Sequence, residues 1–240
     1  MGRRAILATA LLLGALPALS CGDEDFEAAD EVVARVEGEA ADSEATSSQK
    51  PSGNESAPRV VFLGTSLTAG YALAEAEAYP ARVGELLAAR GVAVEVVNAG
   101  VSGDTSAGGL ARLDWLLRQQ PDVMVVELGA NDGLRGLPPE VTEANLRSIV
   151  EQSTAAGARV ILVGMKVPPN YGEEYARRFE AVFQDLAGQL GVELVPFLLS
   201  GVAGLPELNL ADGIHPNAEG HALIAQTMAP YVEAAVAALR

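Results

Sequence analysis

The sequence predicts an α/β fold, a three-layer α/β/α sandwich with about five parallel strands. Short aliphatic runs recur from Arg59 onward without polar alternation, which is typical of strands buried on both faces. Longer segments with apolar residues at helical spacing separate these runs. Strands that alternate with helices in this way form a parallel sheet, joined by right-handed crossovers and covered on both faces.

The expected elements succeed one another in a regular order. Strands are expected at 60–63, 92–97, 123–128, 160–163 and 192–195. Helices are expected at 79–90, 110–118, 139–156, 173–190 and 217–239. A glycine follows three of these helices, Pro121 follows the second, and Pro230 is expected to kink or split the last. The order predicts one domain over 58–240.

The N-terminal region has a different composition. Positions 1–20 carry a basic start and then an apolar run too short to span a membrane, which is typical of an export signal. Cys21 is the only cysteine and directly follows a small residue, so it fits the lipid-attachment position of a bacterial lipoprotein. Ordinary cleavage to a soluble product fits the same residues. Positions 22–57 are rich in Glu, Asp, Ala and Ser and predict an acidic disordered linker.

Charge and residue types exclude some partners. The chain has 32 acidic and 16 basic residues, a net charge of −16. It therefore lacks the basic stripe that nucleic-acid binding requires, and no nucleic acid is expected as a partner. The region 58–240 holds two histidines and no cysteine, so a zinc site is poorly supplied. We expect no metal and no organic cofactor.

Polar residues and glycines gather after the expected strands. The segments are 64–70, 98–105, 129–133 and 212–216. Because ligands bind outside the carboxyl ends of the strands in such sheets, these segments should meet at one edge.

The chemistry that these segments can supply is nucleophilic acyl transfer. Ser66 directly follows a strand and is the candidate nucleophile. His215 is the candidate base, and Asp212, three residues earlier, can orient it. Gly103 offers an unobstructed backbone N–H and Asn131 a side-chain amide as donors to an oxyanion.

These motifs resemble those of the SGNH (GDSL-type) hydrolase superfamily. The four letters correspond, in order, to Ser66, Gly103, Asn131 and His215. The longer stretches 97–105, 127–136 and 212–217 are similar to the branch of arylesterases and thioesterase/lysophospholipase enzymes. The resemblance implies a flavodoxin-like sheet, a serine carboxylic-ester hydrolase that works through an acyl-enzyme on a small ester or thioester, and an oxyanion hole that includes the Ser66 N–H.

One position departs from that pattern. The usual Gly-Asp-Ser-Leu reads Gly-Thr-Ser-Leu here, with Thr65 in place of the aspartate. A threonine hydroxyl can still form hydrogen bonds and cap a helix, but it supplies no negative charge. We expect activity, with an altered first loop.

Two loops are candidates for an acyl pocket because they mix apolar residues with prolines. Leu134 and Leu137 lie in the first, and Pro168 and Tyr171 in the second. The alternative is that both are simple surface loops.

Three further residues are expected to be structural. Asp132 should cap or brace its loop, His221 should be a surface or packing residue, and Trp115 should belong to the core.

Alternative functions are a carbohydrate acetyl-esterase of the same fold and a non-catalytic lipoprotein binding module. The export signal places the protein in the periplasm or outside the cell, with a possible membrane tether at Cys21.

Overall fold

The computed structural model describes residues 56–239. The expected export signal, Cys21 and all but the last two positions of the expected linker lie outside the described residues.

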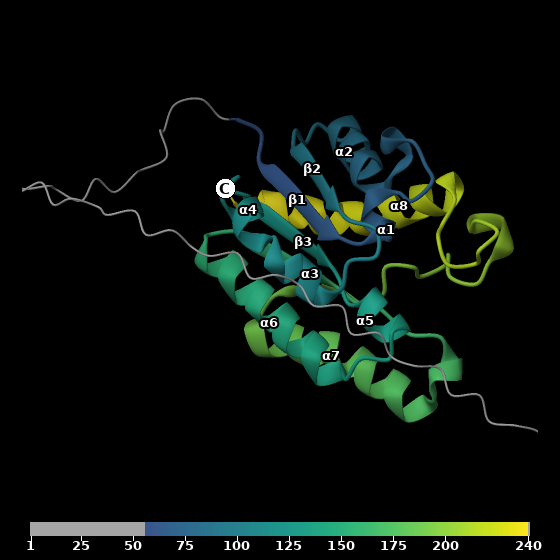
Figure 1. The fold of residues 1–240 in the computed structure, drawn as a ribbon. Coiled ribbons are helices and arrows are strands. Elements are labelled where there is room, and N and C mark those ends of the chain that lie inside the picture. The colour runs from purple at the N-terminus through teal and green to yellow at the C-terminus, as the bar shows by residue number, and fades with distance from the viewer. Residues whose placement is uncertain (1–55, 240) are drawn as a thin grey trace, which may run out of the picture. The chain divides into compact units, whose positions relative to one another are not determined.

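A five-stranded parallel sheet forms the centre of the fold, in the order β2-β1-β3-β4-β5 (Figure 1). Its strands are β1 (Arg59–Gly64), β2 (Glu95–Gly100), β3 (Val123–Glu127), β4 (Arg159–Val163) and β5 (Glu193–Val195). Every residue of β3, and every residue of β1 after Arg59, is buried, as expected for strands covered on both faces. The predicted fold class is confirmed.

Helices cover both faces of the sheet (Figure 1). On one face lie α2 (Tyr79–Ala89) and α8 (Ala218–Ala237), and on the other α6 (Pro139–Ala155) and α7 (Glu173–Leu190). Short helices follow several strands: α1 (Ser66–Ala69), α3 (Ser106–Ala111), α4 (Leu113–Leu117) and α5 (Ala130–Leu134). Single 3₁₀ turns lie at Glu75–Glu77, Pro169–Tyr171 and Pro206–Leu208. None of the helices among residues 56–239 is long and apolar enough to cross a membrane.

The order of the strands creates one switch point, between β1 and β3. The chain leaves β1 for β2 on one side and then returns to β3 on the other. Gly64 pairs with Gly100 and with Glu127, so the ends of these three strands lie at the same level. In sheets of this order the crevice at the carboxyl ends of the strands beside the switch point binds ligands. The segments after β1, β2 and β3 therefore begin side by side.

Two predicted boundaries are wrong. The strand expected from position 92 begins at Glu95, because the Val92 N–H closes the end of α2 on the Leu87 carbonyl. The helix expected at 110–118 begins earlier, at Ser106, where the Thr105 side chain caps it, and it breaks at Arg112 into α3 and α4.

The prediction for Trp115 is also wrong, and of the two alternatives predicted for Pro230 the split is excluded. Trp115 is 58% exposed, because Leu113 and Leu116 occupy the buried face of α4 and turn the intervening residues outward. Pro230 does not split the last helix, since α8 runs through it. A proline removes one N–H donor, and the buried face around Met228 and Val232 holds the helix together in spite of that loss.

Candidate active site

The turn after β1 presents Ser66 at the first position of α1. Thr65 is the N-cap, and its side-chain oxygen accepts a hydrogen bond from the Leu67 N–H. Ser66 is partly exposed, while Thr65 and Leu67 on either side are buried. The Ser66 Oγ lies 2.9 Å from the Nε2 of His215. The serine hydroxyl is thus accessible and already in contact with a base.

The loop before α8 holds His215 and Asp212 in one unit. The Nδ1 of His215 lies 2.8 Å from the Oδ2 of Asp212. The other carboxylate oxygen accepts hydrogen bonds from the backbone N–H groups of His215 and Ile214, at 3.0 and 2.9 Å. The His215 N–H, then the Ile214 N–H, then the imidazole lower the pKa of Asp212 to about 2. An ionised carboxylate only accepts, so Nδ1 carries the proton and Nε2 is free to accept one from Ser66.

The loop after β2 carries Gly103 in a left-handed conformation, with φ of 84°. The Cβ of a larger residue would meet no atom within 4 Å there, so conformation and not space favours glycine. Arg135 donates to the Gly103 carbonyl at 2.9 Å.

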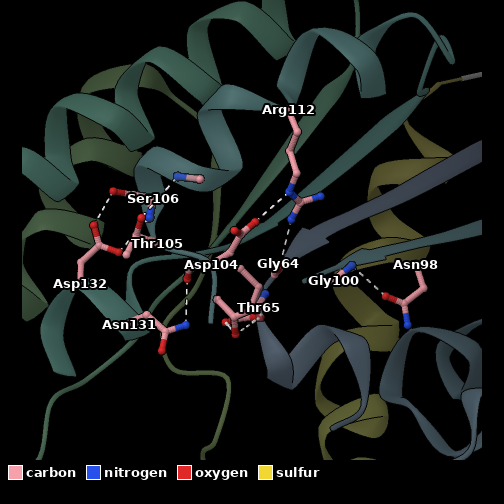
Figure 2. Close-up of polar contacts among 12 residues, drawn as sticks. Gly64, Thr65, Asn98, Gly100, Asp104, Thr105, Ser106, Arg112, Asn131 and Asp132 are labelled. Carbon is pink, nitrogen blue, oxygen red and sulfur yellow. Dashed lines mark hydrogen bonds and ion pairs between the residues drawn. The ribbon is translucent and has the colours of Figure 1, made fainter. Parts of the chain in front are cut away.

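Asn131 lies on α5, directly after β3, at the same edge of the sheet as Gly103. Its Nδ2 donates to the Asp104 carbonyl at 2.8 Å (Figure 2). An amide NH₂ carries two hydrogens, so the second remains available to a ligand. The structure thus brings the segments of Ser66, Gly103, Asn131 and His215 to one edge of the sheet.

Asp132 is a buried residue that stabilises the loop at this edge through hydrogen bonds, as expected. It is fully buried and accepts hydrogen bonds from the N–H and the hydroxyl of Ser106, at 2.8 and 2.5 Å (Figure 2). Thr142 of α6 lies 3.4 Å from the same carboxylate. Its bonds fix the start of α3 to α5. His221 is also structural, since it is buried and its Nδ1 accepts from the Tyr79 N–H.

Glu127 is a buried carboxylate for which no role was predicted from the sequence. It accepts hydrogen bonds from the Thr65 N–H at 2.9 Å, the Thr65 hydroxyl at 3.1 Å and the Thr68 hydroxyl at 2.8 Å. Burial raises its pKa to about 7, against the lowering effect of these bonds. Thr65 therefore keeps the capping role and also donates to Glu127. The available signal was a lone glutamate in the aliphatic run 123–128.

Two further residues at this edge were missed. The ring of Tyr71 lies against the imidazole of His215, with 4.4 Å between ring centroids. Arg112 contacts both Asp104 and Gly64. Neither had a signal in the sequence, because each depends on a partner distant in the chain or on a loop conformation.

The two predicted pocket loops do lie together. The Tyr171 hydroxyl donates to the Leu134 carbonyl at 2.7 Å, and Leu134 is 37% exposed. Leu137 is half-buried, and its carbonyl accepts from the Tyr175 hydroxyl at 2.8 Å. Pro168 is exposed at the start of the second loop.

No group of three or more His, Cys, Asp or Glu side chains among residues 56–239 is arranged to hold a metal ion.

The fold and this site define a class of hydrolase. The chain belongs to the GDSL-like lipase/acylhydrolase family, whose model matches residues 62–223. It is a serine ester hydrolase of the SGNH type.

Curated relatives are similar over most of their length. An arylesterase of Vibrio mimicus is 40% identical over 73% of this chain and 88% of its own. Esterase TesA of Pseudomonas aeruginosa is 45% identical over 67% and 80%. Thioesterase 1/protease 1/lysophospholipase L1 of Escherichia coli is 42% identical over 74% and 84%.

Solved structures agree with this assignment. A crystal structure of TesA superimposes with a TM-score of 0.71 at 40% identity, over 74% of this chain and 99% of that one. Esterase EstA from Pseudoalteromonas sp., inhibited by monoethylphosphonate, gives 0.70 at 35% identity, over 73% and 97%.

Proposed function

We propose that Ser66 is the nucleophile of this hydrolase, with His215 as its general base and Asp212 as the residue that orients the base. The observation that carries the proposal is the continuous chain of contacts from the Ser66 Oγ to His215 Nε2 and from His215 Nδ1 to Asp212, at 2.9 and 2.8 Å. A serine hydroxyl becomes nucleophilic when a neighbouring base accepts its proton, and this geometry supports that transfer.

The reaction runs in two halves. Ser66 attacks the ester or thioester carbonyl while His215 takes its proton, and the protonated imidazole then gives that proton to the leaving alcohol or thiol. Water, deprotonated by His215, attacks the acyl-enzyme, and the protonated His215 then returns this proton to the Ser66 Oγ as the carboxylic acid is released. The N–H groups of Ser66 and Gly103 and the Asn131 amide stabilise the oxyanion in both halves.

We assign the acyl pocket to the two loops that carry Leu134, Leu137, Pro168 and Tyr171. Their support is the contact between Tyr171 and Leu134 and the exposure of the apolar Leu134 side chain close to Asn131 in sequence. The preferred reaction is hydrolysis of aryl esters, other carboxylic esters and thioesters, because curated relatives are an arylesterase and a thioesterase/lysophospholipase.

Ser66→Ala tests the nucleophile. We expect loss of p-nitrophenyl butyrate hydrolysis by at least about 10³-fold, with an unchanged melting temperature, because the hydroxyl makes its one side-chain contact with His215. Ser200→Ala, at an exposed serine after β5 and outside the segments of the site, is the matched control and should keep activity. Wild-type turnover in Ser66→Ala would refute the assignment.

Profiling with wild-type enzyme separates the substrate classes. Activity on aryl and acyl esters above that on acetylated oligosaccharides supports the proposal, and the reverse order favours the carbohydrate acetyl-esterase. The structural similarity to an acetyl-xylooligosaccharide esterase, at 24% identity, reflects the fold alone. The non-catalytic binding module finds no support, since the curated relatives named above are enzymes.

We further propose that the protein is exported to the periplasm or the cell exterior and tethered through a lipid on Cys21. The support is the basic start and apolar run before the only cysteine. Positions 22–57 then act as an acidic spacer between the tether and the domain at 58–240. The mass of the mature N-terminal peptide tests this, because an unmodified Cys21 or cleavage elsewhere would contradict it.

A further inference from the structure

We propose that Arg112 is a positioning residue that holds the oxyanion loop in register with the nucleophile turn. The oxyanion loop is defined here as residues 101–105 and the nucleophile turn as residues 64–68. The inference rests on the roles proposed above for Ser66 and Gly103, which it deepens: it names the side chain that sets the distance between their N–H groups.

The guanidinium of Arg112 contacts both segments at once. Its Nε donates to the Asp104 carboxylate at 2.8 Å, and its Nη2 donates to the Gly64 carbonyl at 3.0 Å (Figure 2). Asp104 directly follows Gly103, and Gly64 lies two residues before Ser66. A planar fork with fixed N–H directions therefore joins the neighbours of two proposed oxyanion donors.

The ion pair of Arg112 with Asp104 is better shielded than the other arginine and lysine pairs in the described part of the chain. The two side chains are 22% and 18% exposed, whereas the next most shielded pair, Arg147 with Glu143, is 31% and 36% exposed. Partly buried pairs are screened less by water and salt, so this contact should hold its geometry more firmly than a surface pair.

Two further side chains that donate to the oxyanion loop come from α5 and from the residue that caps its C-terminus. Asn131 donates to the Asp104 carbonyl, and Arg135 donates to the Gly103 carbonyl. Toward the nucleophile side, the Val101 N–H donates to the Gly64 carbonyl at 3.0 Å, at the start of the loop. Arg112 adds the second connection on that side, at the end of the loop that carries Asp104. Gly103 lies between these two connections.

The backbone is adapted to this contact. The helix predicted at 110–118 breaks at Arg112, where φ is −106° and ψ is 3°, and α3 and α4 lie on either side. The break thus coincides with the residue that bridges the two segments.

Loss of the Arg112 contacts should weaken stabilisation of the transition state rather than binding of the substrate. Oxyanion donors act when they lie about 2.7–3.1 Å from the developing charge, and a misplacement of about 1 Å can cost about 100-fold in rate. The oxyanion is absent from the bound substrate, so a loss of register should lower kcat and leave KM nearly unchanged.

Arg112→Gln and Arg112→Lys test the inference, with Arg147→Gln as the matched control. Arg147 also pairs with a carboxylate and with a second side chain, but it lies on α6. We measure kcat and KM on p-nitrophenyl butyrate, the affinity for an alkyl trifluoromethyl ketone, whose serine adduct carries an oxyanion, and the melting temperature of each variant.

We expect kcat of Arg112→Gln to fall about 10- to 100-fold, KM to change less than about threefold, and ketone affinity to fall by the factor lost in kcat/KM. Arg112→Lys keeps the charge but not the fork and should lose about 3- to 10-fold in kcat. Arg147→Gln should match wild type in all three measurements.

Wild-type kcat in a folded Arg112→Gln, or a loss in KM alone, would overturn the inference. If Arg112→Gln does not fold, Arg112→Lys decides, and wild-type kcat in that variant would overturn it. Ser66→Ala, measured in parallel, separates the two levels: turnover there refutes the proposed function and this inference with it, whereas an inactive Ser66→Ala beside an unaffected Arg112→Gln refutes the inference alone.

Discussion

Glu127 is a single buried residue whose protonation should change the unfolding free energy of the protein. It is a fully buried carboxylate at the end of β3 that binds both ends of the nucleophile turn, through Thr65 and Thr68. The hydrogen bonds favour its charged form, but burial outweighs them and raises the pKa from 4.5 to about 7. The folded protein therefore binds a proton here at pH values where the unfolded chain has already lost it.

The sign of the pH dependence follows from this rise. The contribution of Glu127 to stability is fully present below its unfolded pKa, near 4.5, and is lost as the pH rises toward about 7. The loss corresponds to about 3 kcal/mol. The Glu127→Gln variant has no ionisable group at this position. As the pH rises from 4.5 to 7.5, the unfolding free energy of wild type should therefore fall by about 3 kcal/mol relative to that of the variant.

Urea unfolding at a series of pH values measures that difference. Glu193→Gln, an exposed strand glutamate, controls for the loss of one carboxylate and should follow wild type. Parallel curves for wild type and Glu127→Gln across the whole range would show that Glu127 does not titrate in the folded protein as described.

The residues that act through short sequence motifs could be predicted, and those that act through distant partners could not. Asp212 and His215 are three positions apart and lie in one loop, so the loop itself brings them together. Glu127 meets Thr65 across 62 positions, and Arg112 meets Gly64 across 48. An arginine in a helical pattern ordinarily extends into water, and only the alignment of the strand ends shows why this one does not.

The elements were predictable where one physical cause dominates. The aliphatic runs of β1 and β3 leave no alternative to buried strands, and α7 was expected at 173–190 and observed at Glu173–Leu190. Boundaries failed where tertiary contacts compete with local pattern. The start of β2 is displaced by the closing turn of α2, and the segment of α3 and α4 is divided where Arg112 turns toward β1.

At Pro230, tertiary packing preserves a helix that the local sequence disfavours. Local chemistry predicts a kink or a split at Pro230, yet α8 continues without a split, with Ile224, Met228 and Val232 buried along it. The missing hydrogen bond and the clash of the ring cost about 3 kcal/mol in an isolated helix, and several fully buried aliphatic side chains, each worth about 1.5–3 kcal/mol, offset it.

At the scale of the whole molecule, the strand order explains why so few residues suffice. The sheet aligns Gly64, Gly100 and Glu127, so the three loops that carry Ser66, Gly103 and Asn131 start from one line without long connecting segments. His215 lies at the same edge, in contact with Ser66, although it follows Ser66 by 149 positions in the sequence. The acidic charge of the chain, −16, disfavours anionic surfaces and polyanions as partners.

If this shared edge makes Ser66 the nucleophile, a reagent that reacts only with activated serines should label Ser66 covalently. A fluorophosphonate transfers a phosphonyl group to an activated serine and releases fluoride, and EstA, a relative of known structure, was solved inhibited by monoethylphosphonate. Intact mass and peptide mapping of the labelled protein should show one phosphonyl group, on Ser66, with loss of esterase activity in proportion to labelling. A modified serine elsewhere, or full inhibition with an unmodified Ser66, would contradict the account.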